Sequence, residues 1–137
     1  MADFNALLDG YRRFRGHGWD AQRQRWAELA EGQSPKVMVI ACSDSRVDPS
    51  QIFDARPGEM FVVRNVANLV PPYAPDDNFH STSAALEFAV QSLKVKNIVV
   101  MGHGRCGGIH AAAAMTDRKS TRLNSSHPSK SRMPSSA

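Results

Sequence analysis

Two short polar motifs hold the only two cysteines of this 137-residue chain. Cys42 opens the run Cys-Ser-Asp-Ser-Arg, and Cys106 closes the run His-Gly-Arg-Cys that begins at His103. Thiolate and imidazole together suit zinc best among the common metals. His103 and Cys106 are close enough in sequence to chelate from one turn, with Cys42 as a third ligand. Because three protein ligands with a fourth position left for water are typical of catalytic zinc, the motifs predict a catalytic site.

A carboxylate and a guanidinium accompany the first cysteine. Asp44 can orient a water molecule at the metal, or can take the fourth ligand position itself and close the site. Arg46 can pair with Asp44 through two hydrogen bonds, which keeps the carboxylate ionised and aimed. The simpler alternative is an ordinary ion pair at the start of a helix.

The second motif also fits a competing pattern. From Gly102 to Gly107 the sequence matches G-x-G-x-x-G after an expected strand and before an expected helix, as in dinucleotide-binding proteins. No later strand carries the ribose-binding acid, and Cys42 with its neighbours would have no purpose. Nucleotide binding is therefore the weaker hypothesis.

Strands and helices alternate along the body of the chain. Residues 1–32 have helical periodicity with a break at 16–18, and a further helix is expected from Ser81 or Ser83 through Leu93. The last helix is expected from Gly107 to Met115. Short apolar runs typical of buried parallel strands lie at 37–41, 60–64 and 97–101. We therefore expect an α/β fold, with a mainly parallel β-sheet flanked by helices and preceded by N-terminal helices. Both motifs follow strands, and open α/β sheets form their crevices at the carboxyl ends of the strands.

The last segment, 117–137, differs from the rest. It is rich in serine, has few apolar residues, and holds five basic side chains against one acidic side chain. The formal net charge of +4 therefore belongs to this segment, and the neutral body gives no reason to expect nucleic-acid binding. Residues 117–127 match the translation of a sequencing-library adapter, so we expect a disordered, non-native tail. The expected division is an N-terminal helical segment (1–32), a zinc-binding α/β core (33–116) and this tail.

Three runs of the core resemble the β-class carbonic anhydrases, in particular the plant-like subgroup. They are Gln33 to Val47, Phe61 to Asn68 and Gly102 to Gly108. The resemblance implies one Zn²⁺ per chain on Cys42, His103 and Cys106, and reversible hydration of carbon dioxide to bicarbonate and a proton by zinc-bound hydroxide. It also implies the site roles of the remaining residues: Asp44 and Arg46 as the catalytic dyad, Gln33 reaching substrate from the neighbouring subunit, and Phe61 and Phe88 lining the carbon dioxide pocket.

Relatives in that family continue past the last helix, so the fold is expected to be incomplete and the chain to be C-terminally truncated, with uncertain activity. The family implies a homodimer or higher homo-oligomer for the full-length protein. The alternatives are a non-catalytic zinc-binding fragment and a related hydrolase of carbon disulfide or carbonyl sulfide. The sequence lacks a secretory signal and a membrane-spanning run, so a cytoplasmic protein is expected, with no membrane partner.

Overall fold

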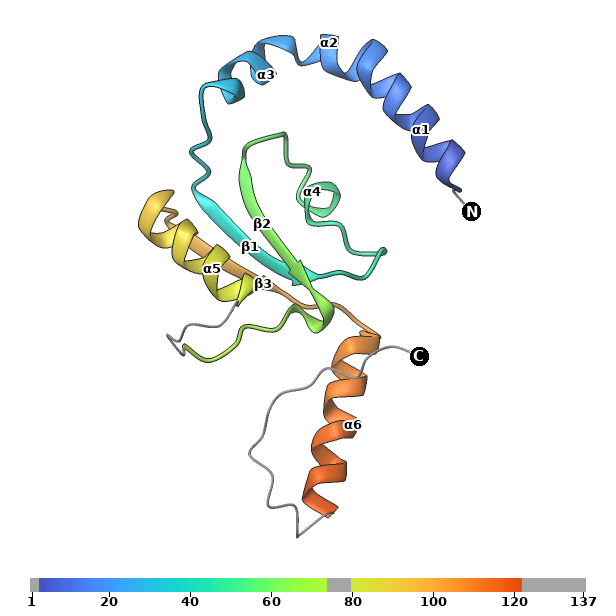
Figure 1. Ribbon diagram of the computed structural model, residues 1–137, viewed down its shortest axis with the longest axis vertical. Coiled ribbons are helices and arrows are strands. Elements are labelled where there is room, and N and C mark those ends of the chain that lie inside the picture. Colours follow the sequence, from blue (N-terminus) through green and yellow to red (C-terminus); the bar gives the residue numbers. More distant parts are fainter. Residues whose placement is uncertain (1–2, 74–79, 122–137) are drawn as a thin grey trace.

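Three parallel strands form the centre of the molecule (Figure 1). The computed structural model describes residues 3–73 and 80–121. The strands are β1 (Val37–Cys42), β2 (Met60–Asn65) and β3 (Asn97–Met101), in the order β2-β1-β3. The register pairs Val37 with both Met60 and Asn97, so all three carboxyl ends lie at one edge of the sheet. The predicted α/β fold with a parallel sheet is confirmed.

The core forms around β1 because this strand has a neighbour on each side. Met38 and Ile40 are fully buried and pack against Ala89. Ala89 belongs to the π-helical segment η3 (Phe88–Ser92), which continues α5 (Ser81–Glu87). Val39 and Ala41, whose side chains point to the opposite face of the sheet, are also buried. Burial on both faces explains why β1 is an uninterrupted apolar run.

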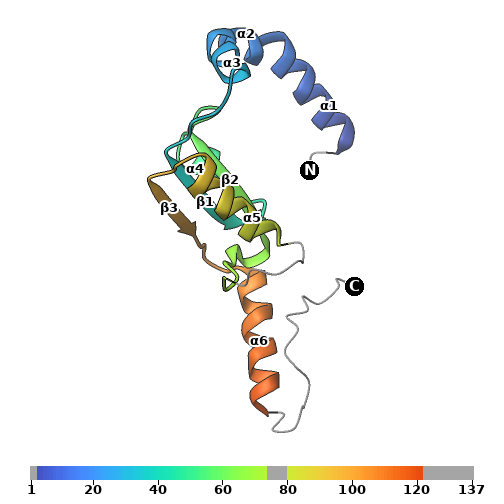
Figure 2. The same cartoon turned by 60° about the vertical axis from the view of Figure 1, so that its left-hand side comes forward.

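The N-terminal helices and α6 lie at the two ends of the sheet. In Figures 1 and 2 the N-terminal helices arch beyond its amino end, and α6 projects from its carboxyl end, where the termini of the strands meet. The short α4 follows β1 and the single turn η2 follows β2. The bounds are α1 (Phe4–Arg13), η1 (Phe14–Gly18), α2 (Trp19–Ala21), α3 (Arg23–Ala30), α4 (Pro49–Ile52), η2 (Val66–Asn68) and α6 (Gly107–Thr121).

The break expected at residues 16–18 lies elsewhere. These residues belong to the π-helical turn η1, which is continuous with its neighbours, and the backbone leaves helical geometry at Gln22 instead. The rings of Trp19 and Trp26 stack at 5.3 Å, and the ring of Phe14 meets that of Trp26 edge-on. A Cβ at Gly18 would lie 3.0 Å from the ring of Phe14. Glycine at this position therefore gives the aromatic ring space to pack rather than ending the helix.

The last helix also differs from its expected length. It continues to Thr121, so residues 117–121 are helical where a disordered tail was expected. An alanine-rich helix that has already formed extends readily, because each added residue gains a hydrogen bond without a new nucleation cost. The remainder of the tail lies outside the described residues, and its non-native origin stays a prediction. Within residues 3–73 and 80–121, no helix has the length and apolarity needed to span a bilayer.

Candidate metal centre

The two cysteine motifs meet at the carboxyl edge of the sheet. Cys42 is the last residue of β1, and His103 and Cys106 lie in the loop between β3 and α6. One ligand atom from each of the three lies within 4.8 Å of the other two. This convergence follows from the strand pairing. Ala41 pairs with Met101, so β1 and β3 end within one residue of each other, and the loops after them begin at the same edge of the sheet.

The two thiols are free and face each other. Cys42 and Cys106 are buried, and their Sγ atoms are 3.8 Å apart. Two sulfurs that bind one tetrahedral zinc at about 2.3 Å are themselves separated by about 3.8 Å. The sulfur positions therefore fit a single zinc ion.

Backbone groups favour the thiolate form of these ligands. Burial raises the pKa of the Cys42 thiol, but the backbone N–H groups of Asp44 and Ala67 lower it, and the net pKa is about 7. On the other ligand, the backbone N–H of Ile109 lies 3.5 Å from Sγ of Cys106 and donates to it. Because the thiolate is the form that binds metal, these contacts prepare the site for a cation.

The third ligand has a fixed orientation and a free acceptor. Nδ1 of His103 donates to the backbone oxygen of Gly104 at 3.0 Å, which leaves the lone pair on Nε2. This Nε2 is buried and has no hydrogen-bond partner among the described residues. Burying an imidazole nitrogen without a partner is unfavourable, and a metal ion would satisfy it. The chemistry and spacing of the three ligand atoms thus agree with the expected zinc.

Asp44 lies beside this cluster and is held by Arg46. Its Oδ1 accepts from Nε of Arg46 at 2.9 Å, and its Oδ2 accepts from Nη2 at 2.7 Å. These contacts, with the backbone N–H of Arg46, hold the pKa of the Asp44 carboxyl well below its usual range. Oδ2 is 3.9 Å from Nε2 of His103. An ionised carboxylate is therefore directed at the group of potential ligands.

Arg64 is a residue of this site to which the sequence analysis assigned no role. It comes from β2, and its guanidinium reaches the loop that follows β1, where it donates to the backbone oxygens of Cys42 and Asp44. It also pairs with Asp48 at 3.1 Å. The available signal was a charged side chain directly after the apolar run Met60–Val63 and within the same strand, since a charge in a strand needs partners.

The turn after β2 forms the floor of the cluster. Ala67 and Asn68 both have left-handed backbone conformations, with φ of 73° and 46°. The side chain of Asn65 holds this turn, because it accepts from the N–H of Leu69 at 2.7 Å and donates to its oxygen at 2.8 Å. Ala67 is buried and packs with Cys42 and Cys106. Gly108, at the start of α6, lies against the same turn: a Cβ there would be 2.9 Å from the backbone nitrogen of Ala67.

Three predicted substrate-binding residues lie away from the cluster within the described chain. Gln33 precedes the amino end of β1 and is exposed. Phe61 pairs in register with Met38, four residues before the end of β2, which corresponds to about 13 Å along the strand. Its ring packs against that of Phe88 at 5.7 Å, and Phe88 is 47% exposed. The two aromatic residues are thus together, at a distance from the thiols, and their substrate roles stay predictions.

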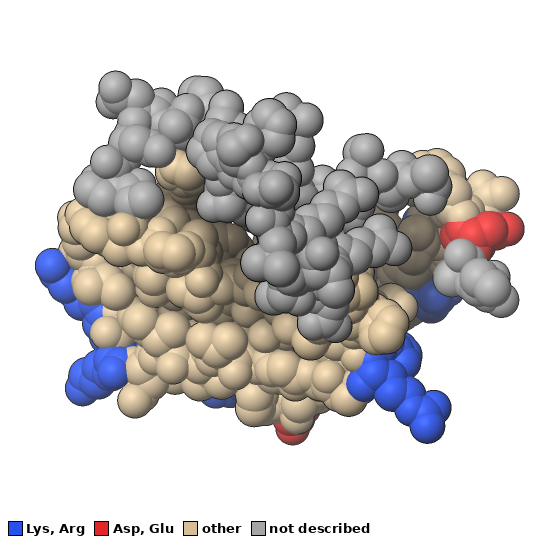
Figure 3. All heavy atoms as spheres, turned by 90° about the horizontal axis from the view of Figure 1, so that it is seen from below, with Lys and Arg blue, Asp and Glu red and all other residues tan. Residues whose placement is uncertain are grey.

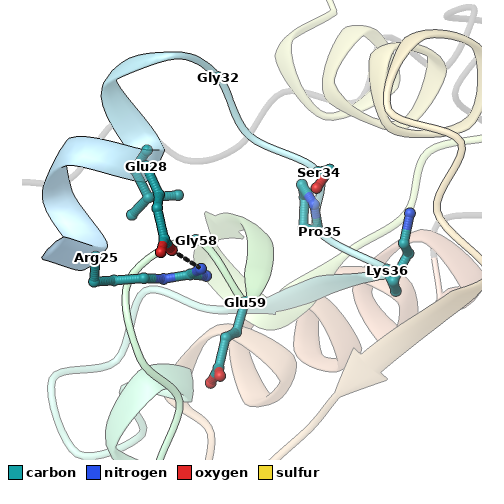
Figure 4. A pocket seen from close by; sticks show the side chains of 9 residues that line it. Arg25, Glu28, Gly32, Ser34, Pro35, Lys36, Gly58 and Glu59 are labelled. Atoms are coloured by element: carbon teal, nitrogen blue, oxygen red, sulfur yellow. Dashed lines mark ion pairs between the residues drawn. The ribbon is translucent and has the colours of Figure 1, made fainter.

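A cavity of about 340 Å³ lies at the amino end of the sheet (Figure 4). It opens between α3 and the start of β1, and an ion pair between Arg25 and Glu28 of 3.6 Å borders it. Arg25 also donates to the backbone oxygen of Pro57 at 2.9 Å. The cavity is at the opposite end of the strands from Cys42, so it is separate from the candidate metal centre.

Charge is sparse on the face seen from the α6 end. In Figure 3 the described surface there is mainly uncharged, and Lys and Arg side chains stand at its margins.

The Carbonic anhydrase family profile matches residues 37–132, which is more than half of the chain and extends beyond the expected core boundary at 116. "Beta carbonic anhydrase 5, chloroplastic" from Arabidopsis thaliana is 52% identical over 99 residues, covering 72% of this chain and 32% of that protein.

Solved structures agree with these sequence matches. The β-carbonic anhydrase CcaA superposes with a TM-score of 0.78 at 33% identity, covering 87% of this chain and 57% of that one. A β-carbonic anhydrase from Sordaria macrospora, described as tetrameric, gives 0.70 at 39% identity, covering 80% of this chain and 53% of that one. The chain therefore spans about a third of the curated relative and a little over half of these solved structures. Profile, sequence and fold agree, and the chain belongs to the β-class carbonic anhydrase family.

Proposed function

We propose that this chain carries the zinc site of a carbonic anhydrase, which interconverts carbon dioxide and bicarbonate with release or uptake of a proton. The observation that carries the proposal is the meeting of Cys42, His103 and Cys106 around a buried, unpartnered imidazole nitrogen. The ionised Asp44 lies next to this nitrogen. Family membership supports the same reaction.

Different side chains of the chain would bind the metal and orient the reacting water. Sγ of Cys42, Sγ of Cys106 and Nε2 of His103 would hold the metal. Zinc bound there supplies Lewis acidity, which lets water lose its proton near neutral pH. Oδ2 of Asp44 accepts a hydrogen bond from the reacting water and so orients its remaining lone pair towards the carbon of the substrate. Arg46 keeps both Asp44 oxygens in place, because its two donors match the two acceptors.

Asp44 also bears on whether the fourth metal position is open. Both of its oxygens already accept from Arg46, and moving Oδ2 onto the metal would require this pairing to weaken. We therefore favour an open position that water occupies, with Asp44 in the orienting role.

The substrate-binding part of the proposal involves a second copy of the chain. Gln33 lies at the far end of β1 from the thiols, so it would reach carbon dioxide only in a neighbouring subunit's site. Phe61 and Phe88 form an apolar pair that also lies away from the thiols of its own chain, so the pair would line the pocket for an uncharged substrate in a neighbouring subunit. A homodimer or larger homo-oligomer is thus part of the proposal, in line with the tetrameric fungal relative.

A cytoplasmic location is also proposed. Cys42 and Cys106 are free thiols at close range, which suits a reducing compartment. The name of the Arabidopsis relative assigns that protein to the chloroplast.

The first experiment measures zinc per chain in the purified protein. We expect about one zinc, lost in His103→Ala and retained in His110→Ala, because His110 is an exposed histidine on α6 outside the ligand cluster. Equal zinc content in the two variants would refute the ligand assignment.

The second experiment measures carbon dioxide hydration by stopped flow with a pH indicator. Asp44→Asn should retain zinc and lose about 10- to 100-fold in kcat/KM, while Asp54→Asn, in an exposed turn, should match the unmodified chain. Zinc binding without any hydration by the unmodified chain would favour the non-catalytic alternative.

A further inference from the structure

Arg64 joins two segments that the candidate metal centre needs in fixed positions. Its side chain is 27% exposed, and its guanidinium lies against the loop between β1 and α4. Nε donates to the oxygen of Cys42 at 2.8 Å, and Nη2 donates to the oxygen of Asp44 at 2.7 Å. Nη1 lies 3.1 Å from Oδ2 of Asp48. Nη2 also lies 3.5 Å from the oxygen of Val47, so one planar group contacts four points of a seven-residue segment.

The two carbonyl contacts determine how the loop is oriented. Cys42 and Asp44 are alternate residues, and each carries a side chain of the proposed site. When a backbone oxygen is held, its peptide plane is held, and with it the direction of the adjoining side chains. Two backbone–backbone hydrogen bonds also hold this loop. The N–H of Ser43 donates to the oxygen of Asn65 at 2.9 Å, and the N–H of Val47 donates to the oxygen of Asp44 at 3.2 Å.

Asp48 connects this arrangement to the next helix. Its Oδ1 accepts from the N–H groups of Ser50 and Gln51 and caps α4, while Oδ2 faces Arg64. The charge of Arg64 is thus balanced by a carboxylate that is itself fixed by the helix start. A lysine at this position would offer a single ammonium, which cannot reproduce the planar, forked set of donors.

We propose that Arg64 is a positioning residue, which holds the loop after β1 so that Cys42 and Asp44 face the metal together. The proposal rests on the proposed zinc site. It differs from a general stabilising role, because it assigns the effect of Arg64 to the geometry of this loop rather than to the sheet.

The test compares Arg64→Gln and Arg64→Lys with Arg56→Gln. Arg56 is a matched control, because it also forms a forked pair, with Glu59, in the turn before β2. Zinc affinity is measured by competition with a chromophoric chelator, and Co²⁺ is bound as a spectroscopic probe of ligand geometry. Arg64→Gln should weaken zinc binding by about 10- to 100-fold, Arg64→Lys should weaken it in the same direction, and Arg56→Gln should leave it unchanged.

The Co²⁺ absorption spectrum is the measurement that a purely structural role would not alter. At saturating Co²⁺ the Arg64 variants should show changed visible bands, since Cys42 and Asp44 would no longer be fixed around the ion. In Arg64→Ala, guanidinium at concentrations far below the molar range that unfolds proteins should restore the original bands. If Arg64→Gln does not fold, Arg64→Lys and this rescue decide the result.

A metal-free measurement separates the two proposals. Amide hydrogen exchange at Ser43 and Val47 should become faster in the Arg64 variants than in Arg56→Gln, whether or not metal is present. Unchanged exchange, an unchanged Co²⁺ spectrum or zinc affinity within threefold of the unmodified chain would overturn the role of Arg64. Failure of the unmodified chain itself to bind zinc would instead refute the proposed function.

Discussion

Gly108 gives a quantitative test of how closely α6 must approach the turn after β2. A Cβ added at this position would lie 2.7 Å from Cγ1 of Val66, and 2.9 Å from both Cβ and N of Ala67. Ordinary contacts between carbon atoms begin near 3.5 Å, so the start of α6 would have to move by about 0.6–0.8 Å. Two of the three obstructing atoms belong to Ala67, in a left-handed turn that Asn65 holds in place.

The cost can be estimated for Gly108→Ala. Overpacking of this kind costs about 1–3 kcal/mol, and replacing glycine by alanine in a helix returns up to about 1 kcal/mol. We expect a net loss of about 1–2 kcal/mol in the free energy of unfolding. Cys106 directly precedes α6, so the displacement would change its distance from Cys42, and a site held to within about 0.5 Å does not tolerate such a change. If metal binding must restore the strained position, the same 1–2 kcal/mol weakens zinc affinity by about 5- to 30-fold.

Gly107→Ala is the control, because a Cβ there meets nothing within 4 Å. This variant should bind zinc like the unmodified chain and should gain up to about 1 kcal/mol in stability. Urea unfolding without metal and chelator competition with zinc measure the two quantities. Equal zinc affinities for the two alanine variants would show that close contact between α6 and Ala67 does not set the geometry of the cluster.

Two further substitutions test the core and an acid-sensitive ion pair. Met38→Ala should lower the free energy of unfolding in urea by about 2–5 kcal/mol, because Met38 is fully buried on the central strand. Val62→Ala should lower it by about 1 kcal/mol, because Val62 on β2 is 37% exposed. Similar losses in the two variants would contradict the assigned core. The backbone N–H and the guanidinium of Arg56 lower the pKa of Glu59, so its ionised form contributes stability at neutral pH that is lost as the pH falls below about 4. Glu59→Gln should therefore flatten the acid side of a plot of stability against pH, and Arg56→Gln, which keeps the backbone N–H donor, should flatten it less; an unchanged slope in both variants would show that these contacts contribute nothing.

The sheet could be predicted from sequence because its strands are short apolar runs between polar turns. The bounds of β3 agree with the expected 97–101, and β1 and β2 each extend one residue further. The meeting of Cys42 with His103 and Cys106 was also predictable, since all three follow parallel strands and the strands end at one edge. The catalytic roles assigned to Asp44 and Arg46 are not decided by their geometry and stay predictions.

Features that depend on tertiary contacts could not be predicted in the same way. Nothing in the sequence around Arg64 indicates that its partners are backbone oxygens at the end of β1 and in the loop that follows it. No local sequence signal predicts the left-handed conformation of Ala67, because alanine has no preference for it. This conformation follows from the two hydrogen bonds between the side chain of Asn65 and the backbone of Leu69. In the N-terminal segment, the glycines suggested a break, but aromatic packing of Phe14 with Trp19 and Trp26 keeps the helix continuous.

The strand order has a consequence for protein synthesis. The ribosome releases β1 and β2 within about thirty residues of each other, so the half of the site with Cys42 and Arg64 can form early in translation. His103 and Cys106 emerge only after β3, the third described strand of the sheet. Between the synthesis of Cys42 and that of Cys106 the nascent chain presents a single thiol, and it acquires a chelating set only when the third strand docks. Metal capture therefore waits for β3, because a chain that stalls before this strand lacks two of the three proposed ligands.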